Sequence, residues 1–198
     1  MIAIIDYGIG NVFNVQNAVF PLMNDTILTK NPEEILSASH IILPGVGAFR
    51  DAIEALEKYN LIEVLQRAHE KQIPILGICL GMQLLYEKSY ENGEYKGLGF
   101  LSGAVTRFPE PQVKRIPQIG WNALIKNKRS LFDGVEGDVY FVHSYYAQGT
   151  DDEILSYVNY DGVKVPAIVG KGKVYGMQFH PEKSAEVGRL LLERFFAL

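Results

Sequence analysis

The one cysteine of the chain lies where its thiol could act as a nucleophile. Cys79 stands between Gly77 and Gly81, two positions away on either side. Residues 73–78 fit a buried strand and residues 82–87 the start of a helix, so Cys79 falls at a strand-to-helix junction. Such a turn forces the nucleophile into a strained conformation and brings neighbouring backbone close, which explains the glycines. The spacing therefore predicts a thiol counterpart of the nucleophile elbow.

The predicted junction would also activate the thiol. The positive end of a helix dipole favours the thiolate, the form that attacks carbonyl carbons. The backbone N–H of Leu80 would point toward the oxyanion that such an attack creates. A structural role is the alternative, because a lone buried cysteine usually behaves as a small hydrophobic residue. The glycine spacing favours the nucleophile.

A thiol nucleophile needs a base, and His180 is the histidine best placed to supply one. It follows a predicted strand at residues 174–179 and leads into Pro181 and Glu182. Glu182 could hold the tautomer and orientation of the imidazole while the imidazole takes the thiol proton. An ordinary loop with a surface glutamate is the alternative, since a histidine and a glutamate two residues apart are a weak signal by themselves.

Two other kinds of site, for a metal ion and for a nucleotide, lack the residue spacing that they need. Cys79, His180, Glu182 and His143 could ligate a metal, but the chain has no Cys-x-x-Cys or His-x-x-x-His pair. The glycine loops at residues 6–11 and 43–47 lack the third glycine of a dinucleotide fingerprint and the Gly-Lys-Ser/Thr of a P-loop. We therefore expect no metal and no cofactor. The glycine pair after the predicted strand 41–43 would permit a peptide flip that adds a second oxyanion N–H.

The composition narrows the classes of protein to which the chain could belong. The 198 residues are 47% hydrophobic and carry a net charge of −4, which leaves no electrostatic footprint for nucleic acid. No apolar run is long enough for a signal peptide or a membrane span. A single cysteine cannot form an internal disulfide, which fits a reducing compartment. We expect a cytoplasmic protein without nucleic-acid or membrane partners.

The order of predicted elements indicates an α/β fold in one domain, residues 1–198. Short apolar runs in the first half alternate with helical patterns, which is typical of βαβ units around a buried sheet. The second half has short strands separated by turns and predicts largely antiparallel pairing. The predicted strands are residues 1–6, 26–28, 41–43, 73–78, 113–119, 139–142, 154–158, 165–169 and 174–179. The predicted helices are residues 11–19, 52–56, 61–69 and 186–196.

Together these motifs resemble the class I, triad-type glutamine amidotransferases, and within them the glutaminase subunits of imidazole glycerol phosphate synthases. The resemblance spans residues 1–198, and its motifs are specific in combination. The matching runs are residues 5–8, 11, 43–49, 77–83, 120–122, 140–145 and 178–184. It implies a flavodoxin-like three-layer sandwich with a central, mostly parallel sheet and an added antiparallel region in the second half.

The resemblance also implies a reaction and a site. Cys79 would attack the side-chain amide of L-glutamine, with His180 as base and then acid and Glu182 orienting it. Water would then hydrolyse the thioester to glutamate. The family places oxyanion donors at Leu80 and, after a peptide flip, in the loop containing Val46 and Gly47. The matching positions Gln83, Ser144 and Tyr145 would hold glutamine.

The family's partner is a (β/α)₈-barrel cyclase subunit, which receives ammonia through an internal channel. There the ammonia would yield imidazole glycerol phosphate and aminoimidazole carboxamide ribotide in histidine biosynthesis. Trp121, Tyr140 and Lys183 match positions at the interface between the two subunits. Core packing is the alternative for the tryptophan and the tyrosine.

Gln118 departs from the family pattern, because the usual run is Pro-His-Met-Gly-Trp-Asn and this chain has Gln in place of His. It is not a catalytic position. Related glutaminase subunits serve the amidation of surface sugars, so a different ammonia-using synthase is one alternative. A flavodoxin-like thiol sensor is another, of a different class, against which the presence of His180 and Glu182 argues.

Overall fold

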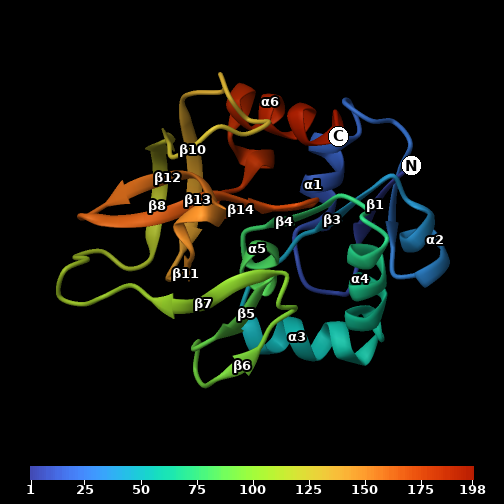
Figure 1. Cartoon of the computed structure of the whole chain (residues 1–198), viewed down its shortest axis with the longest axis horizontal. Helices are drawn as coiled ribbons and strands as arrows, with labels where there is room; N and C mark the ends of the chain where they lie inside the picture. The colour runs from blue at the N-terminus through green and yellow to red at the C-terminus, as the bar shows by residue number, and fades with distance from the viewer.

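A central sheet of eight strands runs through the computed structural model, which describes residues 1–198 (Figure 1). Its order is β2-β1-β3-β4-β14-β13-β12-β9. Strands from β2 to β14 pair in parallel, and β13, β12 and β9 continue the sheet with antiparallel pairing. The strands are β1 Ile2–Ile5, β2 Thr26–Thr29, β3 His40–Leu43, β4 Ile75–Ile78, β9 Ile125–Lys126, β12 Ile154–Tyr160, β13 Val163–Lys171 and β14 Val174–Met177.

Helices cover both faces of the parallel half of this sheet. Alternate residues of a strand point to opposite faces, and β1 shows this clearly. Its Ala3 and Ile5 belong to one hydrophobic cluster, with the helices α2 to α5, and its Ile2 and Ile4 belong to the other, with α1 and α6. The helices are α1 Val12–Val19, α2 Pro32–Ser37, α3 Phe49–Lys58, α4 Leu61–Glu70, α5 Leu80–Leu84 and α6 Ala185–Phe196, with 3₁₀ turns η1 Asp151–Glu153 and η2 Pro181–Lys183.

Two smaller sheets complete the fold. One pairs β8 with β10 in antiparallel fashion, and the other has the order β11-β7-β5-β6. Within the second sheet only β5 and β7 are parallel. These strands are β5 Tyr86–Ser89, β6 Tyr95–Lys96, β7 Leu101–Arg107, β8 Gln118–Ala123, β10 Asp138–His143 and β11 Tyr145–Gly149. The predicted α/β class, with antiparallel strands added in the second half, is confirmed.

Two predicted elements were wrong in their positions. The strand expected at residues 113–119 is instead β8, which begins at Gln118, because Pro117 has no N–H for a strand ladder. The helix expected at residues 82–87 begins earlier and ends at Leu84. Tyr86 lies instead in β5, where it pairs with Leu101 of β7. Long-range strand pairing therefore overrides the local helical pattern.

The topology brings three of the predicted motifs to one edge of the sheet. Strand β4 lies between β3 and β14 and is parallel to both. Their carboxyl ends are followed by the glycine loop at 44–47, by Cys79 and by His180. Side chains that leave adjacent parallel strands at this edge form the usual binding crevice of an open α/β sheet. No helix has the length and apolar character needed to cross a membrane.

Candidate active site

The turn at Cys79 has the strained geometry that the glycine spacing predicts. Cys79 has φ 55° and ψ −111°, a conformation that L-residues rarely adopt. Its N–H donates to the Met177 carbonyl of β14 at 2.8 Å, which ties the turn to the adjacent strand. A Cβ on Gly81 would overlap the carbonyl oxygen of Leu43, and one on Gly77 would lie 2.5 Å from the Gly81 oxygen. Only glycine fits at these two positions.

The glycine loop after β3 packs directly against this turn. A Cβ on Gly45 would lie 2.9 Å from the Gly81 nitrogen, so the two backbones touch. The Tyr7 hydroxyl donates to the Pro44 carbonyl at 2.7 Å and fixes the start of the loop. Gly47, at φ 91°, has a conformation that favours glycine. The loop is therefore anchored at Pro44, while the peptide before Gly47 keeps the conformational freedom that a flip would need.

His180 and Glu182 form a buried pair beside Cys79. The His180 Nδ1 lies 2.7 Å from the Glu182 Oε1, and the side chains are only 5% and 2% exposed. Burial lowers the pKa of His180, but the Cys79 sulfur and the Glu182 carboxylate outweigh it and raise the pKa to about 10. Because Glu182 occupies Nδ1, the imidazole has Nε2 free for the thiol. This is the geometry of a nucleophile, a base and an orienting carboxylate.

Hydrogen bonds to Ser184 and β10 fix the backbone of this segment. The Ser184 hydroxyl donates to the His180 carbonyl at 2.6 Å and accepts from the Tyr140 N–H at 3.0 Å. The His180 N–H donates to the Tyr140 carbonyl at 2.9 Å. The histidine is therefore held by contacts to a residue forty positions earlier in the chain.

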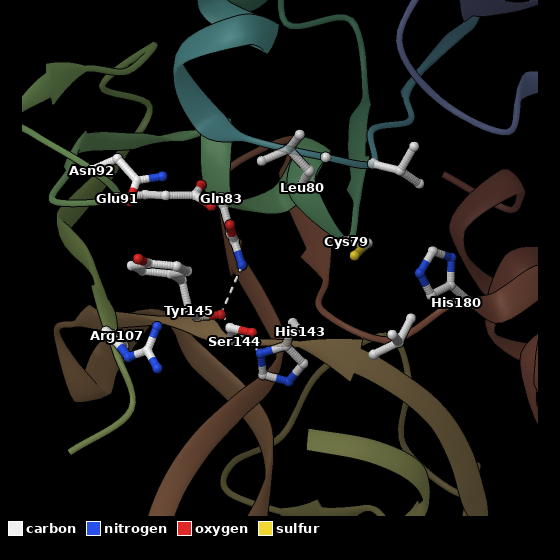
Figure 2. A pocket seen from close by; sticks show the side chains of 13 residues that line it. Cys79, Leu80, Gln83, Glu91, Asn92, Arg107, His143, Ser144, Tyr145 and His180 are labelled. Carbon is white, nitrogen blue, oxygen red and sulfur yellow. Dashed lines mark hydrogen bonds between the residues drawn. The ribbon is translucent and has the colours of Figure 1, made fainter. Parts of the chain in front are cut away.

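Cys79 and His180 open into a cavity of about 480 Å³ (Figure 2). All the predicted oxyanion and substrate residues line it, namely Val46, Gly47, Leu80, Gln83, Ser144 and Tyr145. Glu182 does not line it and lies behind His180. Trp121, Tyr140 and Lys183 do not line it either.

The far end of the cavity carries charged and polar side chains that the sequence did not reveal. Figure 2 shows Glu91, Asn92 and Arg107 at one end and Cys79 and His180 at the other. Glu91 accepts the Phe49 N–H at 2.8 Å, and burial raises the pKa of its carboxyl. Arg107 is exposed at the end of β7 and pairs with Glu110 at 3.1 Å. These residues lie on loops or strand ends and share no motif spacing with Cys79.

His143 lines the same cavity but has a different electrostatic character from His180. Its Nδ1 lies 2.8 Å from the Tyr145 carbonyl, so Nδ1 carries the proton and donates. Burial, with a smaller contribution from His180, lowers the pKa of His143 to about 4 despite that hydrogen bond. His143 is therefore neutral at pH 7. Its cross-strand neighbour is Gln118, which is buried and bonded to Asn122.

The three residues predicted at a subunit interface form one surface cluster. Trp121 of β8 is 50% exposed and meets Tyr140 of β10 edge to face, with ring centroids 5.8 Å apart. The Lys183 Nζ lies over the same tyrosine ring, 5.8 Å from its centroid. Core packing is therefore the wrong explanation for the tryptophan. No group of three or more His, Cys, Asp and Glu side chains could hold a metal ion.

Comparison with known proteins identifies relatives along the whole chain. The sequence model for class-I glutamine amidotransferases matches residues 3–198. Imidazole glycerol phosphate synthase subunit HisH of Lactococcus lactis is 52% identical, covering 98% of this chain and 96% of that protein. The subunit of the same name from Oceanobacillus iheyensis is 50% identical, covering 98% of both.

Solved structures share the fold at much lower sequence identity. A crystal structure of a glutamine amidotransferase superimposes with a TM-score of 0.78 at 19% identity, covering 98% of this chain and 97% of that one. A chain of the PurLQS structure from Thermotoga maritima gives 0.74 at 19% identity, covering 99% and 97%. At this identity the likeness shows the fold alone.

Proposed function

The chain belongs to the class I glutamine amidotransferase family, and we propose that it is the glutaminase subunit of an imidazole glycerol phosphate synthase. It hydrolyses L-glutamine to L-glutamate and supplies the ammonia to a cyclase subunit in histidine biosynthesis. The observation that carries the chemistry is the buried pair of His180 and Glu182 beside the strained thiol of Cys79. The relatives that are 52% and 50% identical support the pathway.

The first half of the reaction forms a thioester. The Cys79 sulfur attacks the side-chain amide carbon of glutamine, and the carbonyl oxygen becomes an oxyanion. Backbone N–H groups at Leu80 and in the loop containing Val46 and Gly47 stabilise that charge. The C–N bond then breaks, His180 gives its proton to the leaving nitrogen, and ammonia departs.

The second half restores the enzyme. Water attacks the thioester carbonyl while His180 takes its proton, the C–S bond breaks, and glutamate leaves. Glu182 stabilises the imidazolium, which its bond to Nδ1 and the raised pKa of His180 both support.

The far end of the cavity suits the α-carbon of free glutamine. Glu91 supplies a carboxylate for the α-ammonium, and Arg107 supplies a guanidinium for the α-carboxylate. Gln83 and Ser144 lie between these charges and Cys79, and Tyr145 lies beside Glu91 and Arg107 at the charged end (Figure 2), so that together they hold the substrate along its length. A glutamine residue within a polypeptide has neither an α-ammonium nor an α-carboxylate, so this arrangement favours free glutamine as the substrate.

The partner is a (β/α)₈-barrel cyclase. It docks on the surface cluster of this chain that Trp121, Tyr140 and Lys183 form. An exposed tryptophan packed edge to face on a tyrosine is typical of interface hot spots. Lys183 lies in the same 3₁₀ turn as Glu182, so the cluster adjoins the catalytic pair. Ammonia that leaves into the partner escapes protonation in bulk water. We place the protein in the cytoplasm, because a catalytic thiol must stay reduced.

The test is glutamate release from L-glutamine by the wild-type chain and by Cys79→Ala. Each is assayed alone and with a histidine-pathway cyclase subunit loaded with its nucleotide substrate. We expect release that depends on Cys79 and rises strongly with the loaded cyclase. Release that ignores the cyclase would retain the glutaminase and redirect the partner to another ammonia-using synthase. Equal release by Cys79→Ala would overturn the mechanism.

A further inference from the structure

We propose that Gln178 is a positioning residue for the nucleophile, holding the Cys79 sulfur through its side-chain amide. The proposal rests on Cys79 being the nucleophile. The Gln178 Nε2 lies 3.9 Å from the Cys79 Sγ, within reach of an N–H···S hydrogen bond. Gln178 is 0% exposed and does not line the cavity, so it acts through Cys79 and not on the substrate.

Hydrogen bonds to the adjacent strands β13 and β14 fix the backbone of Gln178 and of the elbow. The Gln178 N–H donates to the Ala167 carbonyl of β13 at 2.9 Å. The preceding residue, Met177, supplies the carbonyl that accepts the Cys79 N–H. The side-chain amide of Gln178 and the sulfur are therefore attached to adjacent strands through short, rigid connections. Their separation is set by the β4–β14 pairing.

A backbone carbonyl determines which end of the Gln178 amide faces the sulfur. The Tyr145 carbonyl can only accept, so Gln83 must present its NH₂ group there, at 2.9 Å. The same Gln83 Nε2 lies 3.0 Å from the Gln178 Oε1 and donates its second N–H to it. Gln178 therefore turns its oxygen to Gln83 and its NH₂ group to Cys79. The reverse orientation would oppose two NH₂ groups and place an oxygen against the sulfur.

These hydrogen bonds give Gln83 and Gln178 different roles. Both N–H groups of Gln83 are committed within the protein, which leaves its oxygen to accept from the substrate. Gln178 donates to sulfur, and such a bond is stronger to a thiolate than to a neutral thioester. The bond therefore favours the attacking form of Cys79 and relaxes once the thioester has formed. The cost of losing it falls on thiolate formation and not on substrate binding.

The test measures the pH dependence of Cys79 alkylation by iodoacetamide in the full-length chain. Cys79 is the one cysteine, so every alkyl group reports this site. Gln178→Met keeps the length of the side chain and removes the donor. Gln66→Met is the matched control, because the Gln66 side-chain amide likewise donates one hydrogen bond within the protein, to the Leu98 carbonyl and away from the cavity. Thermal unfolding identifies variants that have lost the fold.

We expect the alkylation curve of Gln178→Met to move to higher pH by about half to one unit, the size that one hydrogen bond gives. At any pH below the midpoint of the wild-type curve this slows alkylation about 3- to 10-fold. Glutaminase assays should show the loss in kcat with KM little changed. Two other titratable groups face Cys79, namely the His180 imidazole and the Tyr7 hydroxyl. Both variants retain them.

Gln83→Met gives a second test that leaves Gln178 itself intact. Without Gln83 the Gln178 amide is free to rotate, so the alkylation curve should move to higher pH by a smaller amount than in Gln178→Met. Because the alkylation assay contains no glutamine, this shift cannot come from a loss of substrate binding. The proposal fails if folded Gln178→Met and Gln83→Met both give the wild-type curve, or if Gln66→Met shifts it equally. Alkylation needs no turnover, so a failure of glutaminase activity in the wild-type chain would be a separate result.

Discussion

The two sides of the active site are held in place by different forces. The elbow at Cys79 is fixed by sterics, since Gly77 and Gly81 leave no room for a side chain and no side chain caps helix α5. The segment from His180 to Ser184 is fixed by polar contacts, through the Glu182 carboxylate and the hydrogen bonds between Ser184 and β10. One side resists deformation, and the other depends on charge and hydrogen bonding.

The two kinds of support suit the different tasks of the nucleophile and the base. A nucleophile must point at one place, and a turn that admits only glycine at its flanks gives that direction without titratable groups. A base must change protonation during the cycle, so its neighbours must stabilise the charged form. The steric side should therefore respond to added volume and be insensitive to pH. The polar side should respond to pH and to loss of charge.

The largest effect is expected from adding one methyl group to the elbow. In Gly81→Ala the new Cβ would overlap the Leu43 carbonyl oxygen, and backbone on both sides must move. We expect a loss of about 4 kcal/mol of stability, measured by urea unfolding. Gly172→Ala is the control, because Gly172 has φ 59° but open space around it, and should cost about 1 kcal/mol. A cost for Gly81→Ala no larger than that for Gly172→Ala would show that the contact with the Leu43 carbonyl does not hold the elbow.

Acid should destabilise the protein through His143, a buried neighbour of the polar side whose pKa is lowered in part by His180. The folded protein holds its pKa near 4, so below pH 6.5 the unfolded chain takes up a proton that the folded one does not. Stability is then lost as pH falls from about 6.5 to 4, by up to about 3 kcal/mol. In His143→Asn the dependence of unfolding free energy on pH should be shallower over this range. Parallel curves for the variant and the wild type would contradict the assigned burial.

Removing the charge of Glu182 should reduce catalysis by His180 more than it reduces the stability of the fold. Glu182→Gln takes away a carboxylate that raises the pKa of His180, so the imidazolium is less stable. We expect kcat for glutamate release to fall about 100-fold, equivalent to ~2.7 kcal/mol. Glu186→Gln, on the exposed first turn of α6, should change it little. Full activity in Glu182→Gln would remove the carboxylate from the mechanism.

The smallest effect concerns the strain stored at residue 79. Alanine is usually more stable than glycine, but at φ 55° the order should reverse, because Cβ is disfavoured there. Cys79→Gly should therefore be more stable than Cys79→Ala by about 1 kcal/mol, measured by thermal or urea unfolding. Both variants lack the sulfur, so the comparison isolates the Cβ. The usual order would mean that the turn relaxes without strain.

The same contrast explains how much the sequence predicted. The elbow depends on neighbours two positions away, so the spacing of Gly77, Cys79 and Gly81 was enough to locate it. His180 and Glu182 were also close in sequence, and the strand that precedes them was predicted at residues 174–179. That strand was grouped with the largely antiparallel second half, whereas β14 pairs in parallel with β4. The fold class followed from the change between the two halves of the chain.

The remaining features depend on contacts between distant segments. Glu91 and Arg107 reach the cavity from loops and strand ends with no motif spacing. The orientation of Gln178 depends on Tyr145, which lies on another strand. Strand β8 begins after Pro117, although the apolar pattern predicted an earlier start. Local patterns contain no record of such partners.

The most direct test of the central claim is to trap the intermediate on Cys79. The wild-type chain, bound to a loaded cyclase subunit and mixed with L-glutamine, is quenched in acid during turnover and analysed by mass spectrometry. We predict one γ-glutamyl group per chain, located on the peptide that contains Cys79 and absent from Cys79→Ala. Glutamate release with no adduct on Cys79, and with equal rates in Cys79→Ala, would contradict the account.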